Sequence, residues 1–180
     1  VLIGTEAGMA GDITNHGAVA IGYRALKNLT TGQYNTAIGY EALETMTELD
    51  SNTAIGYQAL KSMSGSAGDV GNTAVGHLAG TAVTTDKHCT FIGRTAGAQT
   101  TNGSTENTFV GYFAGYTNKS GSSNTFIGAH SGYSFQNASN ARNTYLGAYS
   151  GYYNKLGSSN VYLGYTAGYG SSGNSNSNNT

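Results

Sequence analysis

The sequence contains no proline and no tryptophan, and it has a single cysteine and few charged residues. Because Cys89 is the only cysteine, an intrachain disulfide is excluded and stability must come from packing or association. Only 9% of the 180 residues are charged, and eight Lys and Arg nearly balance nine Asp and Glu. Such a chain has no electrostatic patch for nucleic acid or an anionic membrane. No run of about 18 apolar residues is present, so no membrane insertion is predicted.

Glycine, tyrosine and small polar residues are abundant, and they recur periodically. Among the 28 Gly of the chain, ten follow an aliphatic residue at regular spacing. These glycines are Gly4, Gly22, Gly39, Gly56, Gly76, Gly93, Gly111, Gly128, Gly147 and Gly164. Their steps of 17 to 20 residues are too short for helix-pair or propeller repeats, but they suit one coil of a β-solenoid.

We therefore predict an all-β chain, a parallel β-solenoid (a β-roll or β-helix) of about ten coils over residues 1–169. A flexible tail of Gly, Ser and Asn is expected over 170–180. Because Val1 already lies inside a repeat and is not Met, we expect the chain to be a fragment or a processed product. The sequence shows no signal-peptide pattern before its first repeat, so it predicts nothing about targeting.

The residues before each glycine predict a short strand. Asn stands four positions before the glycine in seven copies, Thr or Val stands three before it, and an aliphatic residue directly precedes it. The β-branched string from Asn35 to Tyr40 is typical. We expect the aliphatic side chain to be buried, and the Asn side chains to form an amide ladder between coils.

The residue two before each glycine and the residue four after it compensate each other in volume. Ala37 pairs with Leu43, whereas Phe109 pairs with Gly115, and the later coils keep this reversed order. Close-packed interiors resist both cavities and overfilling, so we expect the two positions to share one buried volume.

Alternation along a strand also predicts association between chains. Phe126 and Ile127 are neighbours and must point to opposite faces, yet both are apolar. A thin coil has one interior, so sister chains in a homotrimer would cover the second face. The residues expected to pack between chains are Phe91, Phe109, Phe126, Tyr145 and Tyr162. In the alternative interpretation, these rings form a surface ladder on a monomer.

The strings NTAIGYEAL (35–43) and NTAIGYQAL (52–60) resemble repeats of bacteriophage tail-fibre proteins, which often precede an intramolecular chaperone domain. They are also similar to the head repeats of trimeric autotransporter adhesins. This resemblance covers nearly the whole chain through Tyr169. It implies left-handed parallel β-rolls in a homotrimer that binds host surfaces from the extracellular space, the cell surface or the virion.

An enzymatic function is not predicted. A glycosidase of the tailspike kind needs paired carboxylates, but no Asp or Glu follows Glu106. Glu41 and Glu44 are interpreted as solubilising charges. Asp86, His88 and Cys89 lack a second ligand cluster, so no metal or cofactor is predicted.

Two rows of side chains remain as candidate binding surfaces. The candidate ligand contacts are Tyr116, Tyr133, Tyr152 and Tyr169, because exposed aromatic rings with polar tips suit glycan or protein receptors. Mutual stacking that stiffens the rod is the alternative role for these rings. The Thr row resembles the hydroxyl arrays of ice-binding solenoids, although it shares a face with the aliphatic row.

We therefore expect a trimeric fibre segment that acts as a spacer, with receptor or glycan adhesion and end-to-end assembly of rods as further expectations. The alternative is a monomeric β-solenoid that binds ice or glycan through one flat face.

Overall fold

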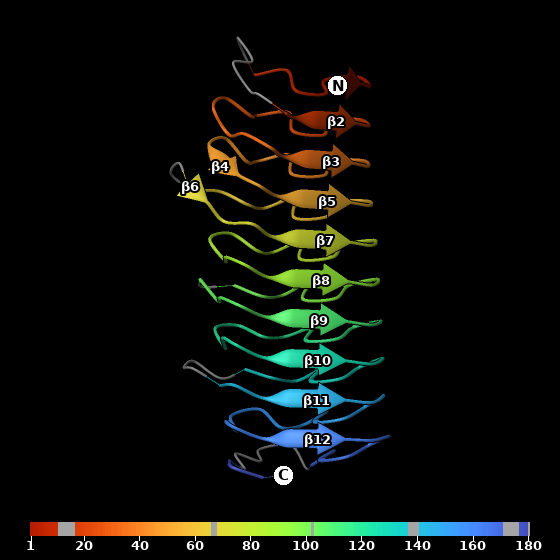
Figure 1. The fold of residues 1–180 in the computed structure, drawn as a ribbon. Helices are drawn as coiled ribbons and strands as arrows, with labels where there is room; N and C mark the ends of the chain where they lie inside the picture. The colour runs from red at the N-terminus through yellow and green to blue at the C-terminus, as the bar shows by residue number, and fades with distance from the viewer. Residues whose placement is uncertain (11–16, 66–67, 102, 137–140, 171–176, 180) are drawn as a thin grey trace.

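The chain forms a straight stack of parallel coils. The computed structural model describes residues 1–10, 17–65, 68–101, 103–136, 141–170 and 177–179, and these contain strands and turns but no helix. One sheet holds ten parallel strands, one from each coil, so the solenoid makes about nine full turns between its first and last strands (Figure 1). The strands are β1 (Leu2–Ile3), β2 (Val19–Ile21), β3 (Thr36–Ile38), β5 (Thr53–Ile55), β7 (Thr73–Val75), β8 (Thr90–Ile92), β9 (Thr108–Val110), β10 (Thr125–Ile127), β11 (Thr144–Leu146) and β12 (Val161–Leu163). The predicted parallel β-solenoid is confirmed.

Every strand pairs with the same repeat positions of the next coil. Thr108 lies opposite Thr125, for example, and Phe109 opposite Phe126. Variation in coil length is absorbed outside this sheet. Beside it, β4 (Leu49–Asp50) and β6 (Gly68–Asp69) form a separate two-stranded sheet that projects from the rod (Figure 1).

The glycine after each strand is required by the close approach of successive coils. These ten glycines have φ between 122° and 142°, a region that residues with a side chain rarely adopt. A Cβ on Gly111 would lie 2.5 Å from the carbonyl oxygen of Gly128 in the next coil. The first nine glycines all face such a carbonyl, at 2.3 to 2.6 Å. The tenth, Gly164, has no atom of the described residues within 4 Å of the same point.

The predicted exchange of volume between two positions is confirmed inside the coil. A Cβ on Gly115 would lie 2.4 Å from the ring of Phe109, so the aromatic ring occupies the space of the missing side chain. In the earlier coils, Leu43 fills this space from the other side and is fully buried. Leu43 adopts a left-handed backbone with φ of 51°, a conformation that glycine adopts without steric cost.

The fifth coil is small at both positions, and its neighbours fill the gap. A Cβ on Gly80 would lie 2.8 Å from the Leu60 side chain of the preceding coil and 2.9 Å from the Phe91 ring of the following coil. The transition between the two packing modes therefore leaves no empty volume at Gly80.

The structure reverses the predicted faces of the strand. Phe91, Phe109, Phe126 and Tyr145 have no exposed surface in the single chain, so the prediction that they pack between chains is wrong. Tyr162 is partly buried and packs against the same core. The aromatic ring turns inward because the glycine that makes room for it belongs to its own coil. The alternative of a solvent-facing ladder at these positions is wrong for the same reason.

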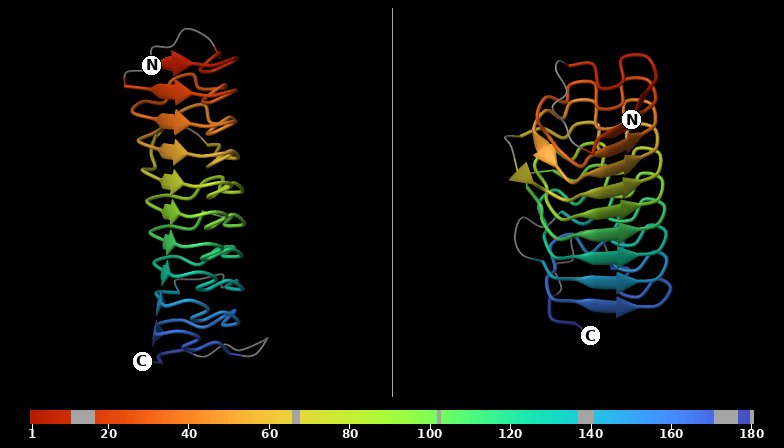
Figure 2. Two further views of the ribbon diagram at one scale, coloured as in Figure 1. Left: turned by 90° about the vertical axis from the view of Figure 1, so that its right-hand side faces the viewer. Right: turned by 45° about the horizontal axis from the view of Figure 1, so that its top comes forward.

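The aliphatic residues before the glycines consequently point outward, not into the core as predicted. Ile92 is 40% exposed and Leu146 44% exposed. The strands lie along one side of the rod and the rest of each coil lies behind them, so no other described segment crosses their outer face (Figure 2). One apolar face of the sheet is therefore uncovered, but it is the aliphatic one.

Asparagine side chains form the expected amide ladder. The backbone N–H and Nδ2 of Asn124 donate to Oδ1 of Asn107 at 3.0 and 3.1 Å, and Asn143 repeats both bonds to Asn124. These side chains are buried, and each bond joins one coil to the next. Cys89 occupies one position of the column and interrupts the ladder between Asn72 and Asn107.

Part of the predicted tail continues this ladder. Asn179 donates from its backbone N–H and from Nδ2 to Oδ1 of Asn160, and its carbonyl accepts from the backbone N–H of Val161. Residues 177–179 thus pair with the last coil. The remainder of the predicted flexible tail beyond Gly170 lies outside the described residues.

Replacing Gly111 with alanine should destabilise the rod by roughly 3 kcal/mol, because the added Cβ meets a neighbouring backbone oxygen and the φ of 138° is strained. Gly164→Ala is the matched control, since its φ of 122° is similar but its Cβ position is open. Urea denaturation would measure both variants. Equal losses of stability in the two variants would show that the contact between coils at the glycines does not contribute to stability.

Phe109→Ala should cost about 3–5 kcal/mol by opening a cavity. Adding Gly115→Leu should recover a substantial part of this loss, because alanine followed by leucine reproduces the packing of Ala37 and Leu43. The free energies of unfolding of the two single variants and the double variant give the coupling energy. A double variant as unstable as the sum of the single changes would contradict the shared volume.

Cys89→Asn should raise the stability by about 1–2 kcal/mol by restoring two bonds of the ladder. The Sγ of Cys89 already lies 3.8 Å from the carbonyl oxygen of Ser104, the equivalent of the acceptor that Asn107 Nδ2 uses. Cys89→Ala is the control that removes the thiol without adding an amide. Thermal denaturation in which both variants lose stability alike would argue against an energetic role for the ladder.

Candidate functional site

The outer face of the ten-stranded sheet is a regular surface that the structure leaves uncovered. We call it the sheet face, and it consists of two parallel rows of side chains. The aliphatic row contains Ile3, Ile21, Ile38, Ile55, Val75, Ile92, Val110, Ile127, Leu146 and Leu163. The second row, two residues earlier, contains Val1, Val19, Thr36, Thr53, Thr73, Thr90, Thr108, Thr125, Thr144 and Val161. Neither row contains a charged residue.

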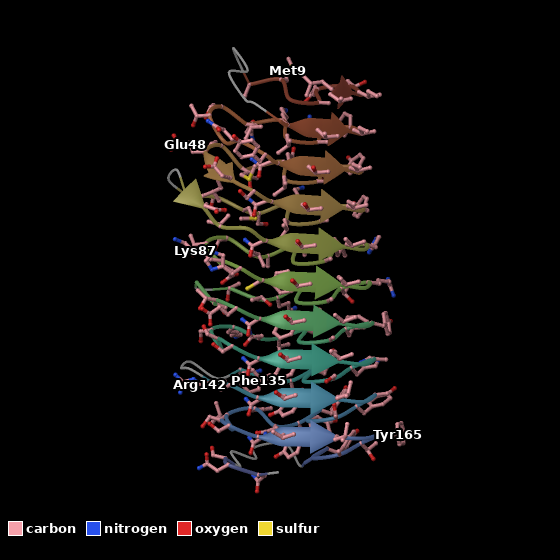
Figure 3. All side chains as sticks on the ribbon, in the orientation of Figure 1. Met9, Glu48, Lys87, Phe135, Arg142 and Tyr165 are labelled. Carbon is pink, nitrogen blue, oxygen red and sulfur yellow. The ribbon has the colours of Figure 1, made fainter. Side chains whose placement is uncertain are left out.

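Aromatic residues, counting His77, occupy the corner after six of the ten strands. Tyr23, Tyr40 and Tyr57 stack with ring centroids 5.0 and 5.3 Å apart, and His77 continues the stack at 5.0 Å. In the last coil, the equivalent Tyr165 projects from the end of β12 (Figure 3). This corner column borders the aliphatic row, and it contains one charged residue, Arg94.

Beyond the corner, the turn of each coil contributes to two further columns, two and five residues after the glycine. In the first coils these columns hold alternating charges. Glu6 binds Arg24 and Lys27 at 2.8 Å each, while Lys61 binds Glu41 at 2.6 Å and Glu44 at 3.3 Å. Lys61 and Gln58 donate hydrogen bonds to Glu41, and they hold the pKa of this carboxyl below its usual value despite partial burial. Glu41 and Glu44 thus bridge successive coils, beyond the solubilising role expected for them.

In the last coils, the second of these columns is the predicted tyrosine series. Tyr116, Tyr133, Tyr152 and Tyr169 lie on successive coils, with ring centroids 5.2, 4.9 and 5.3 Å apart and planes within 17° of parallel. The structure therefore brings all four candidate ligand contacts together. Because each ring covers the face of the next, ring edges and hydroxyl groups remain for outside contact.

A second aromatic column beside the tyrosine series was not predicted from the sequence. Phe113, His130 and Tyr149 stack at 5.5 and 4.9 Å, and His130 lies 5.5 Å from Tyr133. Burial lowers the pKa of His130, and its Nδ1 has no hydrogen-bond partner in the described part of the chain. These three residues stand two positions after their glycines, so comparing that repeat position across coils could have revealed them.

The residues weighed as metal ligands do not form a metal site. Cys89 is buried, and burial raises the pKa of its thiol to about 12, whereas His88 is exposed. Across the described ranges, no group of three or more His, Cys, Asp or Glu residues could hold a metal ion. A side cavity of about 240 Å³ near β4 and β6 is lined by Leu49, Val70 and Lys87, among others, but by no carboxylate.

Asp86 is the one buried carboxyl among the described residues that lacks a hydrogen-bond partner for its oxygens. Burial raises its pKa to about 6, although the nearby backbone of Ser104 and Gly103 partly opposes this shift. Asp86 lies inside the coil, with no second carboxylate or histidine beside it in a metal-binding group. Its ionisation therefore lowers the stability of the fold, since burying a charge is energetically unfavourable.

Comparison with known proteins identifies no family for this chain, so its fold class is what the structure establishes. No family model, no curated protein and no solved structure matches this chain. Within the described residues, no helix is long and apolar enough to cross a membrane. The chain is a parallel β-solenoid repeat protein, and its resemblance to tail-fibre and adhesin repeats stays a prediction from the quoted strings.

Asp86→Asn should stabilise the protein by about 3 kcal/mol at neutral pH, because burial raises the pKa of the Asp86 carboxyl to about 6 and makes its ionisation in the folded state unfavourable by about that much. The folded carboxyl keeps its proton to higher pH than the unfolded one. Its unfavourable effect is therefore absent below pH 4, grows as the pH rises through 6, and is constant above.

Urea denaturation of both proteins between pH 3 and 8 would measure this difference. Glu6 and Glu41, whose pKa values are lowered, act in the opposite direction but equally in both proteins, so the difference isolates Asp86. A difference that does not change with pH would contradict a buried, protonated Asp86.

Proposed function

We propose that this chain is a non-enzymatic fibre segment whose copies associate through the sheet face, most simply as a homotrimer around a common axis. The supporting observation is the uninterrupted aliphatic row, partly exposed in the single chain from β1 to β12. Contiguous apolar patches of this length on a soluble protein mark association surfaces. The occupant of the face is a second copy of the chain.

The dimensions of the sheet face set the size of this contact. Ten strands about 4.8 Å apart make a face about 43 Å long, and three strand residues per coil make it about 10 Å wide. The resulting area, roughly 430 Å², is about half of the approximately 800 Å² that each partner contributes to a stable interface, so the corner column beside the aliphatic row must share the contact. The face is also uncharged along both rows, so its burial leaves no unpaired ion.

Periodicity favours self-association over binding to an irregular partner. The aliphatic and Thr rows repeat once per coil, and the register is unbroken through all ten strands. A copy of the same rod presents ridges and grooves at the same spacing. Closed rotational symmetry then lets every copy use the same face.

The proposed place of this segment is a virion or cell-surface fibre, where it acts as a spacer. This part of the proposal is supported by the likeness of residues 35–43 and 52–60 to tail-fibre and adhesin repeats. The stacked tyrosines offer hydroxyl groups and ring edges for adhesion to a glycan or protein receptor. Wide, flat ring faces are covered within the stack, which favours contact through the hydroxyl groups.

Ile92→Lys should weaken association strongly, because three ammonium groups would meet near the axis of the trimer while each monomer stays folded. Sedimentation equilibrium over a wide range of concentrations would measure the mass. Leu156→Lys is the matched control, because Leu156 is 54% exposed in a turn and not on the sheet face. A wild-type chain that stays monomeric, or equal masses for both variants, would contradict the proposal.

A second candidate function is binding of ice by a monomer through the same face. The observation in its favour is that the Thr row lies on the same outward face of the sheet as the aliphatic row. Thermal hysteresis of the monomer in a freezing-point assay would test it. Activity in a protein of monomeric mass would replace the fibre proposal, and its absence would remove this candidate.

A further inference from the structure

We propose that the exposed tyrosine ladder is a site of oxidative cross-linking, at which Tyr133 and Tyr152 couple to dityrosine and covalently join two successive coils. The proposal rests on the ring geometry and does not depend on trimer formation. In the unmodified chain, stacking and hydrogen bonds hold Tyr133 and Tyr152 in place, and dityrosine would add a covalent bond between them.

The geometry places the two phenol rings for coupling. Their centroids lie 4.9 Å apart and their planes differ by 4°, the most nearly parallel pair among the described rings. The backbone fixes this arrangement, because the N–H of Ser134 donates to the carbonyl of Tyr152 at 3.0 Å. Both rings are partly exposed, so an oxidant can reach them and water can take up their protons.

The reaction requires a one-electron oxidant, such as a peroxidase intermediate or a photo-oxidised ruthenium complex. Each phenol loses one electron to the oxidant and its hydroxyl proton to water, which gives two phenoxyl radicals. Spin density lies on the Cε carbons beside each hydroxyl-bearing carbon, and one Cε–Cε bond forms between the rings. The hydrogen on each joined carbon then moves to the phenolic oxygen, so the product has lost two electrons and two protons in total.

A buried pair with similar stacking shows which feature decides reactivity. Tyr145 and Tyr162 lie 4.9 Å apart with planes 18° apart, but Tyr145 has no exposed surface. Burial raises its pKa, and Asn154 donates a hydrogen bond to its hydroxyl oxygen. Loss of a proton to water is therefore blocked, and we expect this pair to stay uncoupled.

Coupling would constrain the chain between residues 133 and 152 much as a disulfide does. A cross-link lowers the entropy of the unfolded chain, so the oxidised rod should unfold at a higher temperature than the untreated one. Tyr116 and Tyr169 extend the same column and could add links to their neighbours.

The experiment is photo-oxidation of the full chain at low concentration with a ruthenium complex and persulfate, followed by trypsin digestion and mass spectrometry. Cleavage after Lys119, Arg142 and Lys155 places Tyr133 and Tyr152 in separate peptides, 120–142 and 143–155. The expected product is these two peptides joined with the loss of two hydrogens. It should be absent after the same treatment in concentrated urea.

Tyr152→Phe keeps an aromatic ring in the stack and should remove most of the joined product. Tyr153→Phe is the matched control, because Tyr153 is partly exposed in the same peptide but meets Tyr152 edge-on, at 83°. It should leave the yield unchanged. The proposal is overturned if no joined peptide forms, if urea does not reduce its yield, or if the two variants lose it equally.

Discussion

The close approach of identical coils at their glycines is the constraint on which the rest of the structure depends. Each of the first nine glycines that end a strand lies against the backbone of the next coil, with no room for a side chain. This contact sets one coil directly above another, so every repeat position becomes a column. Asparagine ladders, aromatic stacks and alternating charges all follow from that register.

Exact stacking gives the two sides of each strand different roles. The residue two before the glycine fills the interior, together with the residue four after it, while the residue directly before the glycine faces outward. A coil of 17 to 20 residues has no further segment with which to cover that outer face. Packing inside one chain therefore creates the surface through which we propose that several chains associate.

The sequence predicted the period, the strands, the shared volume and the amide ladder, because each is visible as a recurring residue type. It did not yield the correct face for the aromatic rings, since Phe126 and Ile127 are both apolar and alternation alone gives no direction. The volume exchange between Phe126 and Gly132 indicated the correct face. A ring that fills the space left by a glycine of its own coil must point into that coil. The column of Phe113, His130 and Tyr149 was missed because its members differ in residue type.

Chemical protection of the sheet face tests the central claim most directly. A cysteine introduced as Ile92→Cys can be alkylated in solution, while the native Cys89 is buried and holds its proton. We expect its alkylation in the native assembly to be much slower than that of Leu156→Cys, and the two rates to become equal in denaturant. Equal rates in the native protein would show that the sheet face is open to water and would contradict the account.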